Sequence, residues 1–158
     1  MEKSPIRPTD DDARALARSL MEGATFAALG VIDPATGAPF VSRIAFALDS
    51  TGQPLTLIST LAFHTTALQE NPRCSLLVGE PPNKGDPLAF PRLTLSASAE
   101  ILPVSDKPRL RDIYLKTHPK AQLYIDFTDF HFVAFAINGA ALNGGFGKAY
   151  VLTPADLA

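Results

Sequence analysis

The chain has 158 residues, of which 46% are hydrophobic and 19% are charged, a composition typical of a folded protein and not of a disordered one. Fourteen basic residues against sixteen acidic residues give a formal net charge of −2, which provides no broad basic surface for nucleic acid or an anionic membrane. We therefore expect no nucleic-acid or membrane partner, and one domain over 1–158 with a core from about 13 to 152.

The opening segment Met1–Asp12 reads MEKSPIRPTDDD and contains no apolar core, so we expect no signal peptide. No later apolar run approaches a membrane-spanning length, and we expect a cytoplasmic protein. Thr9, followed by three aspartates, is predicted to cap a helix that ends at Gly23. Helical spacing is carried by Ala13, Leu16, Ala17 and Leu20.

The rest of the chain is dominated by short strands with turn residues between them. A short helix is predicted within 60–71, and an interrupted one over 105–117 and 120–127, with the break at His118-Pro119. The predicted strands are 24–32, 40–49, 55–59, 73–80, 92–104 and 130–137, with a glycine-rich hairpin and a last strand over 138–152. Six or seven strands in a meander predict an antiparallel barrel with peripheral helices, in the mainly β (α+β) class.

The strand 92–104 alternates between an apolar face and a polar one. Between Arg92, which opens the strand, and Glu100 the polar side chains are short and lack the long charged groups expected toward open solvent. We expect this face to meet another subunit or a ligand. It consists of Arg92, Thr94, Ser96 and Ser98.

Arg43 is predicted to share one face of its strand with small residues only, namely Val41, Ala45 and Ala47. A guanidinium among small side chains leaves room for a flat or anionic ligand beside it. The alternative is a surface arginine paired with a carboxylate, and this feature alone does not decide between them.

The segment 57–66 runs from a strand into the start of a helix and contains four hydroxyls and one imidazole. Free amides at a helix start, with hydroxyl donors beside them, are suited to phosphate. Phosphate would also favour the protonated form of His64. The alternative is that Ser59 or Thr60 simply caps the helix, which accounts for one hydroxyl and not for the group.

The other reactive side chains have simpler interpretations. Cys74 lies in an apolar run, where a small buried hydrophobic residue is expected, and as the single cysteine it excludes an internal disulfide. His118 and His131 have no neighbours at metal-ligand spacing and are interpreted as structural, so no metal is expected. No dinucleotide-binding fingerprint, Walker loop or nucleophile elbow is present.

Taken in order, seven motifs resemble the pyridoxamine 5′-phosphate oxidase-related family, and most closely its haem-utilisation-type branch of FMN-binding split barrels. The resemblance covers about Ala13 to Ala149. The motifs are Ser42-Arg43, Leu57 to Thr65, Asn71 to Leu77, Asp86-Pro87-Leu88, Arg92 to Leu95, His118-Pro119 and Gly144 to Ala149.

The resemblance implies a homodimer with FMN held between subunits. It implies that Arg43, Ser59 and Thr60 lie near the phosphate, with His64 and Thr65 completing the site. Arg92 matches a position that reaches the cofactor across the interface. Gly145, Phe146 and Lys148 match a closing segment near the flavin ring.

Two departures bear on the activity. This sequence lacks the tryptophan and the arginine-histidine pattern of the vitamin B6 oxidases, and we do not expect the further C-terminal domain common in haem-utilisation members. We therefore expect an FMN-dependent oxidoreductase of unknown substrate, with an electron donor such as NAD(P)H and no identifiable catalytic residue. The alternatives are a non-catalytic flavin or haem binding protein and a binder of vitamin B6 phosphate.

Overall fold

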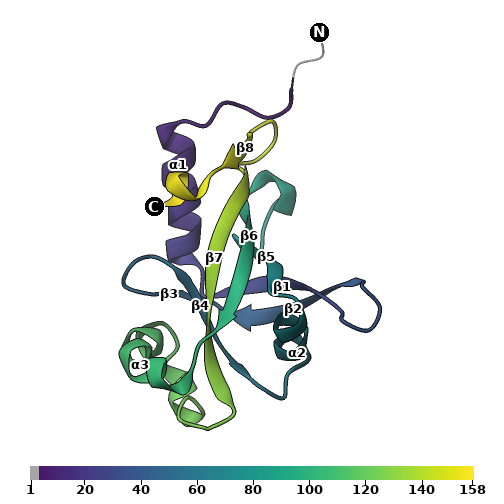
Figure 1. Cartoon of the computed structure of the whole chain (residues 1–158). Coiled ribbons are helices and arrows are strands. Elements are labelled where there is room, and N and C mark those ends of the chain that lie inside the picture. The colour runs from purple at the N-terminus through teal and green to yellow at the C-terminus, as the bar shows by residue number, and fades with distance from the viewer. Residues whose placement is uncertain (1–3) are drawn as a thin grey trace.

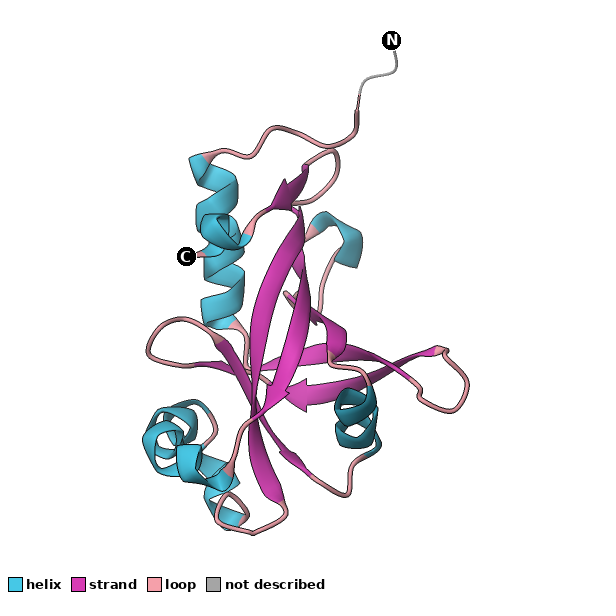
Figure 2. Cartoon of the chain, viewed as in Figure 1, coloured by secondary structure: helices cyan, strands magenta, loops and turns pink. Residues whose placement is uncertain are grey.

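The computed structural model describes residues 4–158; Met1–Lys3, the start of the segment expected to lack a signal peptide, lie outside the described residues. An antiparallel sheet forms the centre of the molecule and helices surround it (Figures 1 and 2). The strands are β1 Phe26–Ile32, β2 Pro39–Ala45, β3 Ala47–Leu48, β4 Pro54–Ser59, β5 Arg73–Val78, β6 Arg92–Ile101, β7 Phe130–Asn143 and β8 Ala149–Leu152. The helices are α1 Asp11–Gly23, α2 Phe63–Glu70 and α3 Lys107–Thr117, with 3₁₀ turns η1 Pro87–Ala89, η2 Val104–Asp106, η3 Pro119–Leu123 and η4 Pro154–Leu157.

The sheet curls until its two ends meet. Its strand order is β2-β1-β5-β6-β7-β4-β3, and β8 pairs with β7 outside this path. Only Phe46 separates β2 from β3, so the first and last strands of the order belong to one continuous segment. The long strand β7 pairs with β4 through its first half and with β8 through Ala140–Asn143. The predicted antiparallel split barrel with peripheral helices is confirmed.

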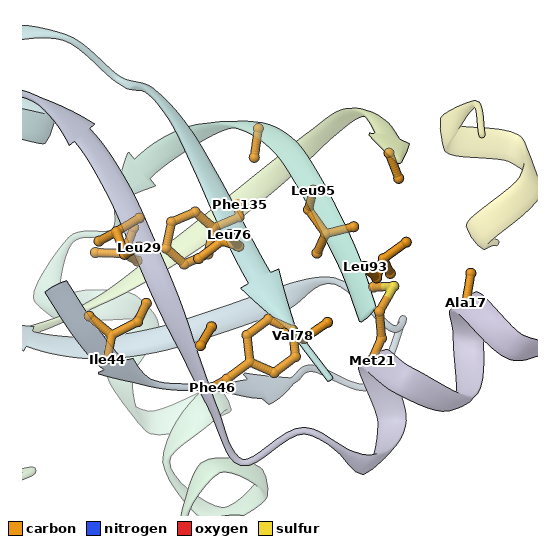
Figure 3. Packing of buried hydrophobic residues seen from close by; sticks show 14 of the residues in the cluster. Ala17, Met21, Leu29, Ile44, Phe46, Leu76, Val78, Leu93, Leu95 and Phe135 are labelled. Atoms are coloured by element: carbon orange, nitrogen blue, oxygen red, sulfur yellow. The ribbon is translucent and has the colours of Figure 1, made fainter. Parts of the chain in front are cut away.

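The main core lies between the sheet and α1. Along β1, Ala27, Leu29 and Val31 are buried, and the residues between them are only partly buried, as strand alternation requires. Figure 3 shows Leu29 beside Leu76 and Phe135, while Ala17 and Met21 of α1 reach the same cluster. A second cluster joins α3 to the other side of β4 and β7, with Tyr114 against Phe132 at a ring distance of 5.2 Å. Two separate clusters therefore hold the helices in place.

The first helix begins differently from the prediction. Its N-cap is Asp10, whose carboxylate accepts a hydrogen bond from the amide of Ala13 at 2.8 Å. Thr9 instead donates its hydroxyl to the carbonyl of Val151 at 2.9 Å. A carboxylate caps as well as a hydroxyl and adds charge that favours the positive end of the helix. The prediction of Thr9 as the cap was wrong, and the predicted end at Gly23 is confirmed.

The predicted strand end at 137 was also wrong, because β7 continues to Asn143 and takes in the first glycine of the predicted hairpin segment 138–152. Gly139 lies inside β7, opposite Ser96, where the register with β6 shifts between Ser96 and Ala97. A glycine inside a strand often marks such an irregularity. The turn follows at 144–148, where Gly145 and Gly147 have φ values of 116° and 71°.

Two smaller differences concern the prolines that follow β6 and α3. β6 ends at Ile101, short of the predicted 104, because Pro103 introduces the turn η2. The predicted helix 120–127 is only the 3₁₀ turn η3, which begins at Pro119 and ends at Leu123. No helix within residues 4–158 has the length and apolar character needed to cross a membrane.

Candidate functional site

The turn before α2 is held by its own hydroxyls. The Ser59 hydroxyl donates to a carboxylate oxygen of Asp129 at 2.8 Å and accepts from the amide of Leu61 at 3.1 Å. The Thr65 hydroxyl is buried and donates to the Ser59 carbonyl at 2.6 Å. Ser59 and Thr65 therefore fix the backbone here, and the exposed Thr60 makes no side-chain hydrogen bond among the residues described.

The first turn of α2 itself is uncapped. Its N-cap is Ala62, which has no side chain able to accept a hydrogen bond, so neither Ser59 nor Thr60 is the cap. The amides of Ala62 and Thr65 already donate to the carbonyls of Ser59 and Ala62, each at 3.1 Å, so the amides of Phe63 and His64 are the ones without an acceptor among the residues described. The helix dipole makes an anion favourable at these two amides. The alternative in which Ser59 or Thr60 caps the helix is therefore not observed.

His64 lies in this first turn with one ring nitrogen engaged and the other free. Its Nδ1 is 3.3 Å from the hydroxyl of Ser42 on β2. Its Nε2 is buried without a hydrogen-bond partner in the described structure. Burial lowers the pKa of His64 below its ordinary value, because it disfavours the charged imidazolium. An orphaned buried nitrogen beside free helix amides fits a phosphate group.

Arg43 follows Ser42 on β2 and points to the opposite face of the strand. Its guanidinium lies over the ring of Phe26, 5.4 Å from the centroid. No carboxylate in residues 4–158 lies within salt-bridge distance of it, so the alternative of a paired surface arginine is not observed. Ala47 is buried in the cluster that contains α3, so the expected bed of small residues beside Arg43 is open only toward Val41 and Ala45.

Arg92 belongs to a different part of the structure. It opens β6 and donates from Nη1 to the carbonyl of Leu88 at 2.9 Å. Asn143, its partner on β7, accepts at 3.0 Å from the amide of Gly145, and a Cβ at Gly145 would come within 3.0 Å of the Ala89 carbonyl. These contacts bring Arg92 and Gly145 together around η1.

Phe146 and Lys148 are exposed in the turn that follows Gly145, and Phe146 is 70% exposed. The predicted residues thus form three groups within one chain. Ser59, Thr60, His64 and Thr65 surround the start of α2. Arg43 lies on the outer side of β2, and the last group is Arg92, Gly145, Phe146 and Lys148.

One row of outward-facing residues crosses six strands of the sheet and connects Arg43 with the neighbourhood of Arg92. Each member is paired in register with the next. All except Arg43 are uncharged, and Leu77 and Val151 are 45% and 62% exposed. We call this row the open face: Arg43, Ala28, Leu77, Thr94, Ala141 and Val151.

The sequence interpretation missed two contributors. Ser42 contacts His64 across 22 positions of sequence, and its place opposite Arg43 on the strand was the available signal. Asp129 lies 70 positions from Ser59, and nothing in the local sequence indicates that pairing.

Cys74 is half-buried as a free thiol, and burial raises its pKa to about 11. Residues 4–158 contain no group of three histidine, cysteine, aspartate or glutamate side chains placed to hold a metal ion.

Known proteins share this architecture. An Arabidopsis thaliana protein named non-canonical heme oxygenase HOZ, chloroplastic, is 40% identical over 97 residues, which are 61% of this chain and 29% of that protein. The chain thus spans less than a third of this curated relative.

Two solved structures extend the likeness. A heme binding protein from Mycobacterium smegmatis is 27% identical with a TM-score of 0.83, and the match covers 96% of this chain and 61% of that chain. A Clostridium acetobutylicum protein of the pyridoxinephosphate oxidase family is 16% identical with a TM-score of 0.73, over 95% of this chain and 100% of that one, and shows the shared fold alone. The family model for the CREG β-barrel matches residues 8–157. The chain belongs to the CREG β-barrel family, within the split-barrel fold that the sequence resemblance indicated.

Proposed function

We propose that this protein binds FMN, with the phosphate at the start of α2, and that it is a flavin-dependent oxidoreductase. The observation that carries the proposal is the uncapped first turn of α2 beside the unpartnered Nε2 of His64. Free amides, the helix dipole and an imidazole that gains a proton all favour a phosphate group. Bound FMN would supply hydride or electron transfer, and the chain would bind and orient it.

The residues of the proposed site have different roles. Thr60 and His64 have free polar groups and would contact the phosphate directly. Ser59 and Thr65 would act by holding the backbone of the turn, because their hydroxyls are already used within the chain. Arg43 points to the face of β2 opposite Ser42 and His64, and its guanidinium has no carboxylate partner within residues 4–158, so it would contact FMN from that other face. Arginine suits phosphate because its donors can form two parallel hydrogen bonds.

The site is proposed to be completed by a second copy of the chain. The open face has mostly apolar and small side chains on six adjacent strands, and Leu77, Ala141 and Val151 are left exposed by the rest of residues 4–158. Exposed patches of this kind are typical of protein interfaces. Arg92, Gly145, Phe146 and Lys148 lie at one end of this side of the sheet, and in a homodimer they would approach the partner's flavin.

The second candidate function is a flavin or haem binding protein without catalysis. It is favoured by the relatives named for heme, the Mycobacterium smegmatis protein above all, which matches nearly the whole chain. In our proposal His64 is used by phosphate, which makes it a poor axial ligand for haem iron. The two candidates differ in whether the loaded protein turns over an electron donor.

Absorption spectra of the purified chain, before and after addition of FMN, haemin or pyridoxal 5′-phosphate, test these proposals together. We expect a flavin spectrum that stays with the protein through gel filtration. Oxidation of NADH or NADPH by the FMN-loaded chain would then support an oxidoreductase. A haem spectrum with no retained flavin would support the second candidate, and a retained pyridoxal spectrum would indicate a vitamin B6 phosphate binder.

A further inference from the structure

A groove separate from the start of α2 lies between β1–β2 and the segment that follows α3. It has a volume of about 620 Å³. One wall contains Phe26, Arg43 and Ala45, and the other contains Lys120 and Tyr124. We call it the α3 groove. None of the sequence motifs assigned a function to this second wall.

The α3 groove is positively charged. Arg43 and Lys120 line it, and no aspartate or glutamate does. Neither cation forms a salt bridge within residues 4–158. Two unpaired cations over one hollow, in a chain whose net charge is negative, make a local site for an anion.

The walls of the α3 groove also carry two aromatic rings, and both are held in place. The guanidinium of Arg43 lies over Phe26 at 5.4 Å and has no carboxylate partner within residues 4–158, so its N–H groups can donate to the carboxylate of a ligand. Tyr124 packs against Phe130 with ring centroids 4.8 Å apart. A planar ligand could lie against these rings at little cost in side-chain ordering.

His118 fixes the far wall to the barrel. Its Nε2 is 2.8 Å from the carbonyl of Phe46, the residue that links β2 to β3. Its ring also packs in a tilted arrangement against Tyr114, with ring centroids 4.8 Å apart. The wall that carries Lys120 is therefore anchored immediately before η3, so the groove is formed without a ligand.

We propose that the α3 groove binds a small organic anion with a planar conjugated ring, its carboxylate paired with Arg43 and Lys120 and its ring against Phe26 and Tyr124. This binding does not require the flavin. If FMN binds as proposed, Arg43 belongs to both the flavin site and the α3 groove. The planar anion in the groove would then be the substrate of the flavin, an assignment that rests on the proposed function.

The test is a titration of the full chain with 2-naphthoate, followed by two-dimensional amide NMR. We expect saturable shifts at residues of the groove walls, and Lys120→Ala should weaken binding by about ten-fold because one charge-assisted contact is lost. Lys116→Ala, on an exposed residue of α3 outside the groove lining, is the matched control and should bind as the wild type does. The uncharged analogue 2-naphthylmethanol should bind much more weakly.

Absence of shifts at millimolar 2-naphthoate, shifts that map elsewhere, or equal binding by the Lys120 and Lys116 variants would each overturn the proposal. FMN titration of the same two variants separates it from the proposed function. Lys120→Ala should bind FMN normally, since Lys120 is not part of the phosphate site. Naphthoate binding by a chain that does not bind FMN would leave the groove proposal intact and remove the proposed function.

Discussion

The Nδ1 of His64 lies 3.3 Å from the hydroxyl of Ser42, and this contact joins the first turn of α2 to β2 while the opposite ring nitrogen stays buried and unpartnered. The ring is thereby oriented with Nε2 available for one further hydrogen bond. Because burial lowers the pKa of His64, the free protein keeps this imidazole neutral through most of the physiological range.

That protonation behaviour predicts a pH-dependent affinity for FMN. A bound phosphate would raise the pKa of His64, so binding takes up a proton between the lowered and the raised values. Between pH ~8 and pH ~6.5, where the phosphate remains mostly dianionic, affinity should rise as pH falls. His64→Gln should remove this rise. Flavin fluorescence titrations at several pH values measure it, and a parallel pH profile for wild type and variant would contradict the role given to His64.

The same shift predicts a pH effect on stability without ligand. The unfolded chain binds a proton at His64 more readily than the folded chain does, so stability from this group is present above pH ~6.5 and is lost as pH falls through the lowered folded value. Urea denaturation at pH 7.5 and pH 5 should show wild type losing more stability than His64→Gln. An equal loss in both proteins would show that His64 does not contribute.

Asp129 places a negative charge close to the proposed phosphate position through its hydrogen bond to Ser59. Asp129→Asn keeps an oxygen that can accept from Ser59 and removes the charge. We expect FMN to bind about two- to ten-fold more tightly, the effect of ~0.4–1.4 kcal/mol of charge repulsion in a partly solvated site. Asp112→Asn, whose side chain is exposed, is the control. Weaker binding by the Asp129 variant would argue against a phosphate at this turn.

Gly79 supports the backbone of Arg92. Its φ is 103°, and a Cβ there would come within 2.7 Å of the Pro91 carbonyl and 2.9 Å of the Arg92 Cα. Gly79→Ala should therefore lower the free energy of unfolding by about 1 kcal/mol or more beyond the cost of the strained φ alone. It should also displace Arg92. Gly52 has a φ of 87° and open space around it, so Gly52→Ala should lower the free energy of unfolding by the cost of the strained φ only. Urea denaturation compares the two variants, and equal losses would show that the contact with Arg92 is unimportant.

The open face predicts a homodimer. Ser96 is exposed on β6 beside this row, and Ser96→Arg should introduce charge and bulk into the interface and shift the protein to monomer. Ser105→Arg, in the exposed turn η2, gives a matched control that should remain dimeric. Light scattering of both variants reports the mass, and a wild-type monomer at micromolar concentration with bound FMN would refute the shared site.

The predictable part of the fold depended on local signals. Alternation along 92–101 indicated both the buried row Leu93, Leu95 and Ala97 and the outward serines, because strand geometry alone separates the two faces. Glycine was less informative, since Gly139 sits at an irregularity inside β7 and Gly145 lies in the turn that follows. A glycine in a sequence indicates an unusual backbone conformation or a close approach, but it does not distinguish a turn from an irregularity inside a strand.

The candidate site was predictable only in part, because its partners come from distant segments. The segment from Ser59 to Thr65 pointed to the start of α2. The hydrogen bond from Ser59 to Asp129 spans 70 positions, and it decides that this hydroxyl is occupied within the chain. The groove wall around Lys120 depends on how η3 folds back onto β2, which no local pattern encodes.

Equilibrium titration of the purified chain with FMN, comparing wild type, Arg43→Ala, Arg43→Lys and Lys116→Ala, decides whether the chain binds FMN and whether Arg43 contacts it. We expect equimolar binding by wild type and Lys116→Ala. We expect a loss of about ten- to a hundred-fold in Arg43→Ala, from ~1.5–3 kcal/mol of charge-assisted hydrogen bonding, and partial recovery in Arg43→Lys. A wild-type chain that does not bind FMN would contradict the proposed function, and an Arg43→Ala variant that binds as tightly as Lys116→Ala would contradict the placement of the site.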